Sequence, residues 1–594
     1  MPCRRAVPSF PSPPPWRCLG LACWASCHCG VAGKTATSPV PPSSRASAGH
    51  CPAEPLYISA RGCSKRDSIW GVSSCPVARR ACIMSRDRAK TRDTEWALRE
   101  GTPCILAVDV GTTNLKAGIV RADGRVLRVV QRELPLMRDE SGRAEHDPHG
   151  LWDAFREVCR QACEGYGAQT GALVLSAYQL SLLAVDEGGE PLSAIITLLD
   201  TRPQQTFPQL LERVDVHHLY RRTGCPPLFH YPLSKIFWLQ STHPDVFARA
   251  RWLVGVKDYL IHRLTGQWVT EASLGTATQL MNLHTLRWDE YALGVLALEA
   301  ERLPTPVPAE EVLAELLPAV CAQLGMAPGC RLVPGVYDGG AVAIGIGAMP
   351  ERTSAINLGT TAMLRAALPQ PILDSDPAMR LQTCYLACGR WFPGGAINNA
   401  GVTLRWLRDN VLHIDYETMN REAEAVTDSA GLFFLPFLSG ERNPQIGNSA
   451  SGVFFGLRGY HGRGHIVRAV MEGVGFALRI VADALQQNGV TPAEVRIGGG
   501  GSRSSLWLQT MANILGVPLQ VSRVEEPGLV GSAILGYTAL GVYPDVVQAT
   551  QAMVQPGRRY VPDARAVEEY QKKYAFFRRL MADLAQAFAE HTRG

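Results

Sequence analysis

A six-residue pattern occurs twice in this chain, and it constrains the fold more than any other feature. The pattern first spans Val108–Thr113 and returns far along the chain as Ile356–Thr361. Each copy is a short apolar run that ends in Gly-Thr-Thr, which predicts a buried strand entering a tight turn. Repetition over such a distance indicates a duplicated domain. We therefore expect two related halves, each beginning with strands and continuing with helices, as in α/β proteins.

Both turns have the chemistry of phosphate binding. Backbone N–H groups and hydroxyls in such a turn can hold phosphate oxygens, and two turns facing each other would bind one nucleotide. The residues concerned are Gly111, Thr112, Thr113, Gly359, Thr360 and Thr361. A single Gly-Thr-Thr is more often an ordinary turn, so the interpretation depends on the repetition. Where the first copy carries Asp109 the second carries Asn357, so only Asp109 could supply a carboxylate for magnesium.

Size and composition are those of a globular protein with more than one domain. The chain has 594 residues, 46% of them hydrophobic, and a net charge of +5. Such a length favours two or more domains. No basic run is dense enough to indicate nucleic-acid binding, and no uninterrupted apolar stretch of about 18 residues predicts a membrane-spanning helix. We therefore expect neither nucleic acid nor a membrane as a partner.

The first segment differs from the rest in composition. Residues 1–83 hold ten Lys and Arg against two acidic residues, and nine of the 17 cysteines. We interpret residues 1–100 as a disordered or non-native extension; translation from Met84, a targeting peptide and a disordered arm are the alternatives. The Cys27–Cys29 run lacks the spacing of a zinc site. The other eight cysteines show neither metal spacing nor a disulfide framework, which indicates reduced thiols in a cytoplasmic protein.

From Cys104 onward the pattern alternates between strands and helices. Strands are predicted at 105–108, 115–120 and 126–130, a hairpin turn at 122–125, and helices at 151–158, 402–410 and 466–486. Asp147 and Pro148 are a helix start signal for the first of these helices. We place the domain border near Ala348, which divides the folded part into domains of residues 101–348 and 349–594.

Asp338 is a candidate for catalysis because of its place in the pattern. It follows the apolar run 333–337, precedes Gly339 and Gly340, and stands before a small-residue helix predicted over 341–347. A carboxylate between the end of a strand and the start of a helix can face a cleft. The same position also suits an aspartate that caps the helix, and the two roles are compatible.

A glycine loop, Gly498–Gly501, lies between a predicted strand at 495–497 and a predicted helix at 506–515. Glycines allow the backbone to approach a flat ligand closely. A dinucleotide fingerprint does not fit, because its third glycine would fall at Arg503. A structural turn without a ligand is the alternative.

Four segments together resemble a known family. Asp109–Lys116, Tyr337–Gly340, Asn357–Thr361 and Gly498–Arg503 follow the order seen in the FGGY carbohydrate kinases, which the chain resembles from Cys104 onward. The resemblance implies an α/β fold with two ribonuclease-H-like domains of the actin and hexokinase superfamily around a nucleotide cleft. Within the family the chain looks closest to bacterial gluconokinases, on segments 232–239, 394–399, 404–409, 437–442 and 452–457.

The resemblance implies roles for these residues. Asp338 would be the catalytic base that accepts the proton of the attacking sugar hydroxyl. Asp109 would orient Mg²⁺, and ATP would be the phosphate donor. Lys116 would lie just beyond the first phosphate turn. The adenosine loop would include Gly499, Gly500, Ser502 and Arg503.

The sugar side follows the family pattern less closely. Gln179 and Leu180 stand where the family usually has Met-His, Leu198 replaces a usual Trp, and His230 ends a Leu-Phe-His run in place of the gluconokinase His-Pro-Met. Such changes alter hydrogen bonds that select hydroxyl patterns. The candidates for substrate contacts are Gln179, Asp200, Arg202, His230, Asn398 and Asn399. Each of them could instead form a salt bridge or cap a loop.

The sequence thus predicts ATP- and magnesium-dependent phosphorylation of a sugar acid, ketose or polyol. Gluconate, giving 6-phosphogluconate, is the first choice, and xylulose or another pentulose or polyol is the second. An actin-like ATPase or a nucleotide-binding regulator without sugar turnover is the alternative from another class. Asp338 argues against it, because a protein that only binds needs no base there. A homodimer is an expectation from the family alone.

Overall fold

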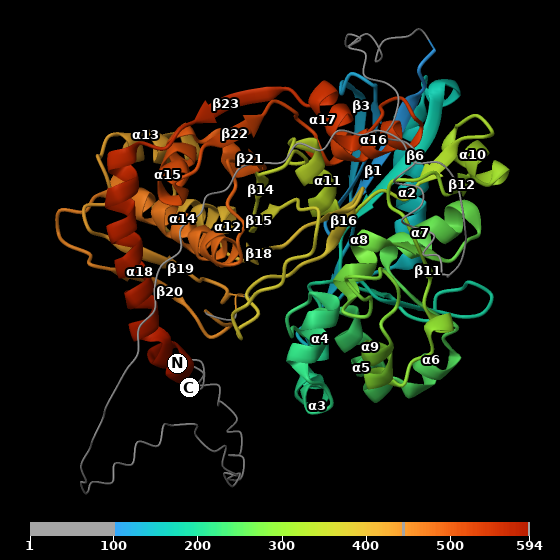
Figure 1. The fold of residues 1–594 in the computed structure, drawn as a ribbon, viewed down its shortest axis with the longest axis horizontal. Helices are drawn as coiled ribbons and strands as arrows, with labels where there is room; N and C mark the ends of the chain where they lie inside the picture. Colours follow the sequence, from blue (N-terminus) through green and yellow to red (C-terminus); the bar gives the residue numbers. More distant parts are fainter. Residues whose placement is uncertain (1–100, 442, 444–445, 592–594) are drawn as a thin grey trace, which may run out of the picture. The chain divides into compact units, whose positions relative to one another are not determined.

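The computed structural model describes residues 101–441, 443 and 446–591, which belong to one compact unit (Figure 1). The expectations for residues 1–100, including the Cys27–Cys29 run and a start at Met84, lie outside the described residues. Within the described ranges, no helix has the length and apolar character needed to cross a membrane.

The first half is built on a six-stranded sheet with the order β12-β13-β6-β1-β2-β3. Its strands are β1 (Cys104–Val110), β2 (Asn114–Val120), β3 (Val126–Glu133), β6 (Thr170–Ala177), β12 (Ala314–Glu315) and β13 (Arg331–Val333). Strands β1, β2 and β3 pair antiparallel, β1, β6 and β13 pair parallel, and β12 closes the edge antiparallel to β13. The predicted hairpin turn joins β2 to β3, with Gly124 at φ 82°.

The second half repeats this arrangement. In the same direction as for the first sheet, its strand order is β23-β22-β21-β14-β15-β18. Its strands are β14 (Thr353–Leu358), β15 (Ala362–Ala366), β18 (Gly394–Ile397), β21 (Glu494–Gly498), β22 (Leu519–Ser522) and β23 (Pro556–Tyr560). Strands β14, β15 and β18 pair antiparallel, β14, β21 and β22 parallel, and β23 antiparallel to β22. The two sheets match position by position, which confirms the duplication predicted from the repeated pattern.

Helices cover the sheets and the segments between them. The helices are α2 (Pro148–Cys163), α3 (Phe207–Leu211), α4 (Val216–Thr223), α5 (Pro232–Thr242), α6 (Pro244–Arg249), α7 (Val256–Thr265), α8 (Ala272–Gly275), α9 (Glu290–Leu296), α10 (Pro318–Leu324), α11 (Asp338–Gly345), α12 (Gly401–Trp406), α13 (Tyr416–Glu424), α14 (Arg463–Gln487), α15 (Ser505–Leu515), α16 (Pro527–Ala539), α17 (Val546–Met553) and α18 (Ala564–His591). The short strands are β4 (Met137–Arg138), β5 (Ala144–His146), β7 (Leu183–Val185), β8 (Ile195–Ile196), β9 (Trp252–Val254), β10 (Val269–Glu271), β11 (Thr305–Val307), β16 (Tyr385–Ala387), β17 (Arg390–Trp391), β19 (Phe433–Pro436) and β20 (Gly452–Phe455). As predicted, Asp147 caps α2, and its carboxylate accepts the N–H of Gly150 at 2.9 Å.

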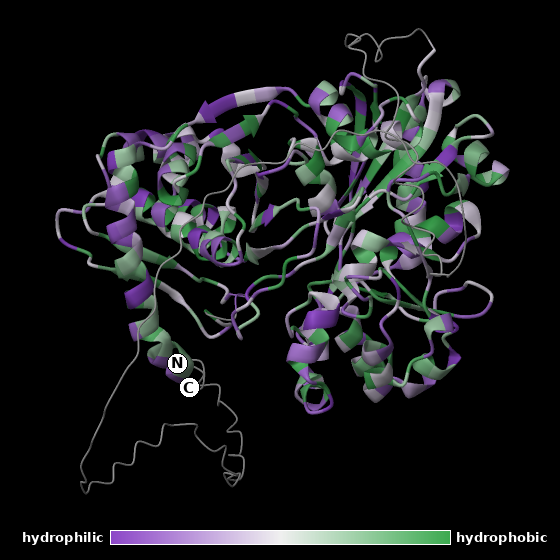
Figure 2. Cartoon of the chain, in the orientation of Figure 1, coloured by the Kyte–Doolittle hydropathy of each residue, from purple (hydrophilic) through white to green (hydrophobic). Residues whose placement is uncertain are grey.

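Strand β1 is buried on both faces. Leu106 and Val108 lie in one core together with Phe155 of α2. Ile105 and Ala107 point to the opposite face and lie in a second core. The sequence of a strand buried on both faces is a continuous apolar run. Figure 2 shows the region of β1 and β6 as largely hydrophobic.

Helix α16 belongs to the second half in sequence but packs on the first sheet. Leu529 and Ile534 of α16 share the second core with Ile105 of β1. The Tyr537 hydroxyl donates to the carbonyl of Val120 at 2.8 Å. Helix α16 also packs along α11. Because the two halves share this core, the border at residue 348 stays a prediction.

Candidate active site

The two Gly-Thr-Thr turns follow equivalent strands, β1 and β14. In the first turn the N–H of Gly111 donates to the carbonyl of Asn114 at 2.9 Å, and in the second the N–H of Gly359 donates to the carbonyl of Thr361 at 3.0 Å. Thr360 and Thr361 are exposed. Both turns therefore reverse the chain at the same point of the sheet and leave polar groups accessible to a ligand.

Charged groups from both halves of the chain meet beside the first turn. Asp109 of β1 lies opposite Lys116 of β2, and the Ser176 hydroxyl donates to its carboxylate at 2.6 Å. The Lys116 ammonium donates to Glu526, the residue before α16, at 2.9 Å. Burial raises the pKa of Asp109, and the bonds and charges of Ser176 and Lys116 oppose that rise. Nothing in the local sequence links Glu526 to Lys116, so Glu526 was not predicted at this site.

Asp338 is the first residue of α11, next to this cluster. The N-cap is Tyr337, and the Asp338 carboxylate accepts the N–H of Gly339 at 2.6 Å. Burial, together with the charge of Asp109, raises the pKa of Asp338 to about 7, although the N–H of Gly339 and the charge of Lys257 act in the opposite direction. A carboxyl group that titrates near neutrality is suited to proton transfer.

A cavity of about 560 Å³ opens beside the second turn. Its lining combines the turn, the glycine loop and the four helices α12, α13, α14 and α15: Gly359, Thr360, Gly401, Leu404, Arg405, Tyr416, Met419, Asn420, Met471, Gly500, Gly501, Arg503, Ser504 and Trp507. The size and the mixed apolar and polar lining suit a small-molecule ligand. The helical residues were not predicted, since Tyr416 and Asn420 belong to an ordinary amphipathic pattern in the sequence.

Gly499 and Ser502 shape the glycine loop from outside this lining. Gly499 adopts φ 95°, and a Cβ atom on it would lie 2.6 Å from the carbonyl oxygen of Leu358. The Ser502 hydroxyl donates to the carbonyl of Gly499 at 2.7 Å. Only a glycine fits a position with this φ and this close approach. Direct contact of these two residues with a ligand stays a prediction.

On the predicted sugar side, Asp200 and Arg202 form one network. Asp200 is fully buried and accepts the backbone N–H of Ala144 at 2.9 Å. The Arg202 guanidinium pairs with both Asp200 and Glu145 and lies over the ring of Trp238 at 4.7 Å. These bonds hold the loop after β8, and a contact with substrate stays a prediction for both residues.

The segment after β6 has a constrained backbone. Leu180 adopts φ 66°, an unfavourable region for a residue with a branched side chain. The buried Lys235 ammonium donates to the carbonyls of Leu180 and Thr197, and burial lowers the pKa of Lys235 to about 7. The side-chain amide nitrogen of Gln179 is buried without a hydrogen-bond partner among the described residues. Strained residues that the surrounding structure holds in place are typical of functional sites.

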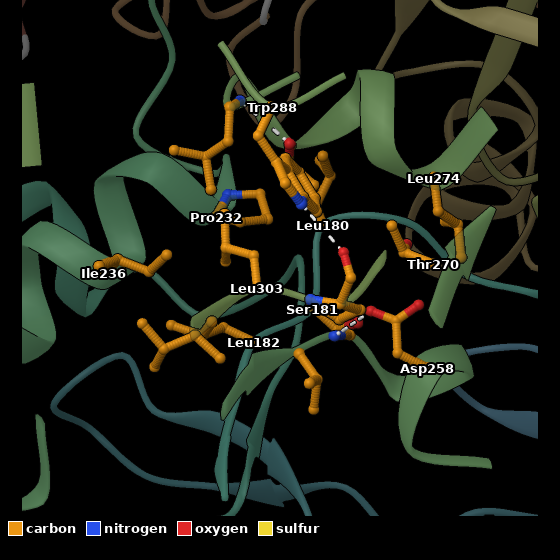
Figure 3. Close-up of a pocket in the computed structure, with 16 residues that line it drawn as sticks. Leu180, Ser181, Leu182, Pro232, Ile236, Asp258, Thr270, Leu274, Trp288 and Leu303 are labelled. Carbon is orange, nitrogen blue, oxygen red and sulfur yellow. Dashed lines mark hydrogen bonds between the residues drawn. The ribbon is translucent and has the colours of Figure 1, made fainter. Parts of the chain in front are cut away.

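A small cavity of about 40 Å³ lies behind this segment. Figure 3 shows Leu180, Ser181 and Leu182 between Pro232 on one side and Asp258 on the other. The Ser181 hydroxyl accepts the N–H of Val256 at 2.9 Å. The volume suffices for water but not for a sugar, so this cavity is too small to be the sugar site.

The remaining predicted contacts lie on two different elements. The side chain of Asn399 is buried, donates to the carbonyl of Gly440 at 2.8 Å, and accepts the N–H of Ser439 at 3.1 Å. The backbone N–H of Asn398 donates to Glu441 at 2.9 Å. His230 stacks on Phe229 in the first half. The asparagines thus brace the segment beside the second turn, and sugar contact by any of the three stays a prediction.

His146 connects the segment after β6 to the first phosphate turn. Its Nε2 lies 3.0 Å from the carbonyl oxygen of Thr112 and its Nδ1 lies 2.9 Å from the Tyr178 hydroxyl. A carbonyl can only accept, so Nε2 carries the proton and donates to Thr112. Burial lowers the pKa of His146 and so favours the neutral ring, in which Nδ1 accepts the proton of Tyr178. The tautomer is therefore fixed by its surroundings.

We expect His146→Leu to loosen the first turn. The variant leaves the Thr112 carbonyl and the Tyr178 hydroxyl without partners, which costs about 1–3 kcal/mol of unfolding free energy. His146→Gln retains an N–H donor and is expected to cost less. Urea unfolding of both variants checks the order, and equal losses would contradict the proposed bond to Thr112.

Comparison with known proteins gives a consistent result. The N-terminal domain model of the FGGY family of carbohydrate kinases matches residues 104–345, and the C-terminal domain model matches residues 354–540. The chain belongs to the FGGY family of carbohydrate kinases. A gluconokinase of Bacillus licheniformis is 31% identical over 82% of this chain and 98% of its own length.

Two solved sugar kinases have a similar fold. A gluconate kinase and a ligand-bound xylulose kinase, both from Lactobacillus acidophilus, superpose with a TM-score of 0.78 each. They are 29% and 28% identical to this chain, and each match covers 82% of this chain and 99% of the solved one. The predicted fold and the carbohydrate kinase activity are thereby confirmed.

Magnesium fits the donors present in this FGGY kinase. Asp109 offers carboxylate oxygens, the ligands that Mg²⁺ takes. The described residues contain no group of three or more His, Cys, Asp or Glu that could hold a metal ion.

Proposed function

We propose that this FGGY kinase transfers the γ-phosphate of ATP to gluconate and yields 6-phosphogluconate. The observation that carries the proposal is the placement of Asp338. Burial and the charge of nearby Asp109 raise its pKa to about 7, and the preceding residue, Tyr337, pairs with Ala177 at the end of β6, where the sugar-side segment begins. A base there accepts the proton of the attacking hydroxyl as the new phosphate ester bond forms and the bond to ADP breaks.

The nucleotide would occupy the 560 Å³ cavity and the two turns. Gly359 and Thr360 lie at the cavity and would hold phosphate oxygens together with Gly111 and Thr112. Lys116 would exchange its bond to Glu526 for a phosphate. Mg²⁺ at Asp109 would neutralise the charge of the phosphates.

A sugar acid is favoured over a neutral sugar by charge. Lys235 is fully buried, and its hydrogen bonds go to backbone carbonyls instead of a carboxylate. Lys235 contacts the two segments predicted to bind the sugar. Burial lowers the pKa of Lys235 to about 7, and a nearby carboxylate would favour the charged form of this amine and be stabilised by it. The gluconokinase relative supports the same choice.

We expect gluconate to be the preferred substrate in a panel with xylulose, ribulose, glycerol and erythritol. The measurement is ADP release with Mg²⁺ and ATP, and kcat/KM for gluconate should exceed that for each neutral sugar by at least about tenfold. If xylulose is the best substrate, the second hypothesis, a xylulose kinase, is supported instead; a xylulose kinase of similar fold is the observation in its favour. ADP release that no sugar stimulates would contradict the proposal.

A further inference from the structure

A closed ring of hydrogen bonds surrounds a single peptide group just before Asp338. This is the peptide that joins Val336 to Tyr337. The Lys257 ammonium donates to the Val336 carbonyl at 3.1 Å, and the Tyr337 N–H donates to the Ser273 hydroxyl at 3.1 Å. Both polar ends of the peptide are therefore held by side chains from another part of the chain.

The two side chains that hold this peptide share one carboxylate. Lys257 pairs with Glu271 at 3.1 Å, and the Ser273 hydroxyl donates to the same oxygen of Glu271 at 2.9 Å. The backbone N–H of Ser273 donates to the other oxygen at 2.6 Å. Lys257, Glu271 and Ser273 are all fully buried. We call these three residues the peptide clamp.

A buried ion pair is poorly explained by stability alone. Desolvating both charges costs as much as their attraction returns, and an apolar pair of similar size is often as stable. In the peptide clamp, the Lys257–Glu271 pair helps to fix the position of the peptide. Three side chains in one hydrogen-bonded ring allow little movement of the peptide between them. Asp338 is the next residue after that peptide.

We propose that Lys257, Glu271 and Ser273 are positioning residues that fix Asp338 for proton transfer. The inference rests on the proposed role of Asp338 as the base. The Tyr337 carbonyl accepts the N–H of Ala341 at 2.9 Å, so the peptide clamp also sets where α11 begins. A displacement of the reacting group by about 1 Å can lower turnover about a hundredfold, so a clamp that holds Asp338 in place should affect turnover strongly.

Ser273→Ala is the variant that tests the clamp in the full-length protein. It removes the acceptor of the Tyr337 N–H and keeps the Lys257–Glu271 pair, so it avoids leaving a buried charge alone. We expect kcat to fall about ten- to a hundredfold, with KM for ATP changed less than about twofold because the nucleotide cavity is not touched. Ser273→Thr restores the hydroxyl and should recover most of kcat.

Thr276→Val is the matched control. Thr276 lies three residues further on, is fully buried, and its hydroxyl likewise accepts a peptide N–H, that of Tyr385, at 2.9 Å. That peptide does not lead to Asp338. We expect near-normal kcat, and an equal fall in Ser273→Ala and Thr276→Val would show a general loss of packing and overturn the proposal.

A second measurement does not depend on the substrate. Hydrogen exchange of the Tyr337 and Gly339 amides should be slow in the wild type and in Thr276→Val, and at least about tenfold faster in Ser273→Ala. Unchanged exchange in Ser273→Ala overturns the clamp, and faster exchange with unchanged kcat overturns its positioning role. If Asp338→Asn keeps full turnover, the proposed role of Asp338 as the base is wrong. The exchange result then still shows whether the peptide clamp holds the Val336–Tyr337 peptide and the Gly339 N–H in place.

Discussion

Asp338→Asn is expected to lower sugar-dependent ADP release by at least about a hundredfold while the affinity for Mg²⁺-ADP changes little. An amide cannot take the proton of the attacking hydroxyl, and general base catalysis contributes about a hundred- to ten-thousandfold. The nucleotide cavity is formed by other residues, so binding should persist. Initial rates and ADP titration measure the two effects separately.

The pH dependence of the wild type tests the same residue. Since burial and the charge of Asp109 raise the pKa of Asp338 to about 7, the active ionised form is lost as the pH falls through about 7. We expect kcat/KM to decline toward acid with a midpoint near this value. A flat profile between about pH 5 and 8 would contradict Asp338 as the base.

The folding stability of Asp338→Asn shows whether the variant loses activity through catalysis or through unfolding. In the unfolded chain an aspartate ionises near pH 3.9, whereas the folded protein keeps the Asp338 proton up to about pH 7. The folded state therefore loses stability as the pH rises through this window. Asn carries no charge, so Asp338→Asn should be at least as stable as the wild type at pH 8. A less stable variant would show that Asp338 supports the fold.

Asp215→Asn is the control for this substitution. Asp215 caps α4 through the N–H of His218 at 2.9 Å, away from the phosphate turns. Asn caps helices about as well as Asp, so turnover and stability should both stay near the wild-type values. A large fall in turnover here would indicate that any Asp to Asn change near a helix start disturbs the enzyme.

Gly531→Ala is expected to destabilise the fold by about 1–3 kcal/mol, and Gly531→Val by more. A Cβ atom on Gly531 of α16 would lie 1.8 Å from the carbonyl oxygen of Ala341 and 2.9 Å from the nitrogen of Gly345, both in α11. A Cβ atom on Gly345 would in turn lie 1.8 Å from the carbonyl oxygen of Pro527. The two helix backbones touch, so a methyl group forces them apart. Urea and thermal unfolding measure the loss.

Activity should fall along with stability in the Gly531 variants. Helix α11 begins with Asp338, so its separation from α16 also moves the base. Gly294→Ala in α9 is the control, because a Cβ atom there meets nothing within 4 Å and alanine favours a helix over glycine by up to about 1 kcal/mol. A Gly531→Ala variant as stable as Gly294→Ala would contradict the close helix contact.

The local pattern was enough to predict the elements of the site. The two Gly-Thr-Thr turns, the strand before the first of them and a helix just after Asp338 all depend on apolar periodicity and on turn residues, which act within a few positions of the chain; the structure starts that helix three residues earlier than predicted, at Asp338 itself. The duplication followed from comparing two such segments. The predicted strands and helices appear with boundaries that differ by a few residues, as for α14, which spans Arg463–Gln487.

Only the tertiary structure decided which charges and helices meet. Lys116 and Glu526 are 410 residues apart, and the peptide clamp joins Lys257, Glu271 and Ser273 to the residue before Asp338. In the sequence a buried Lys or Glu is indistinguishable from one on the surface, because its partner lies on another element. Likewise, Gly531 shows its importance only where α16 crosses α11. Local forces choose the elements, whereas burial of distant apolar faces against one another sets their positions, and those positions make the site.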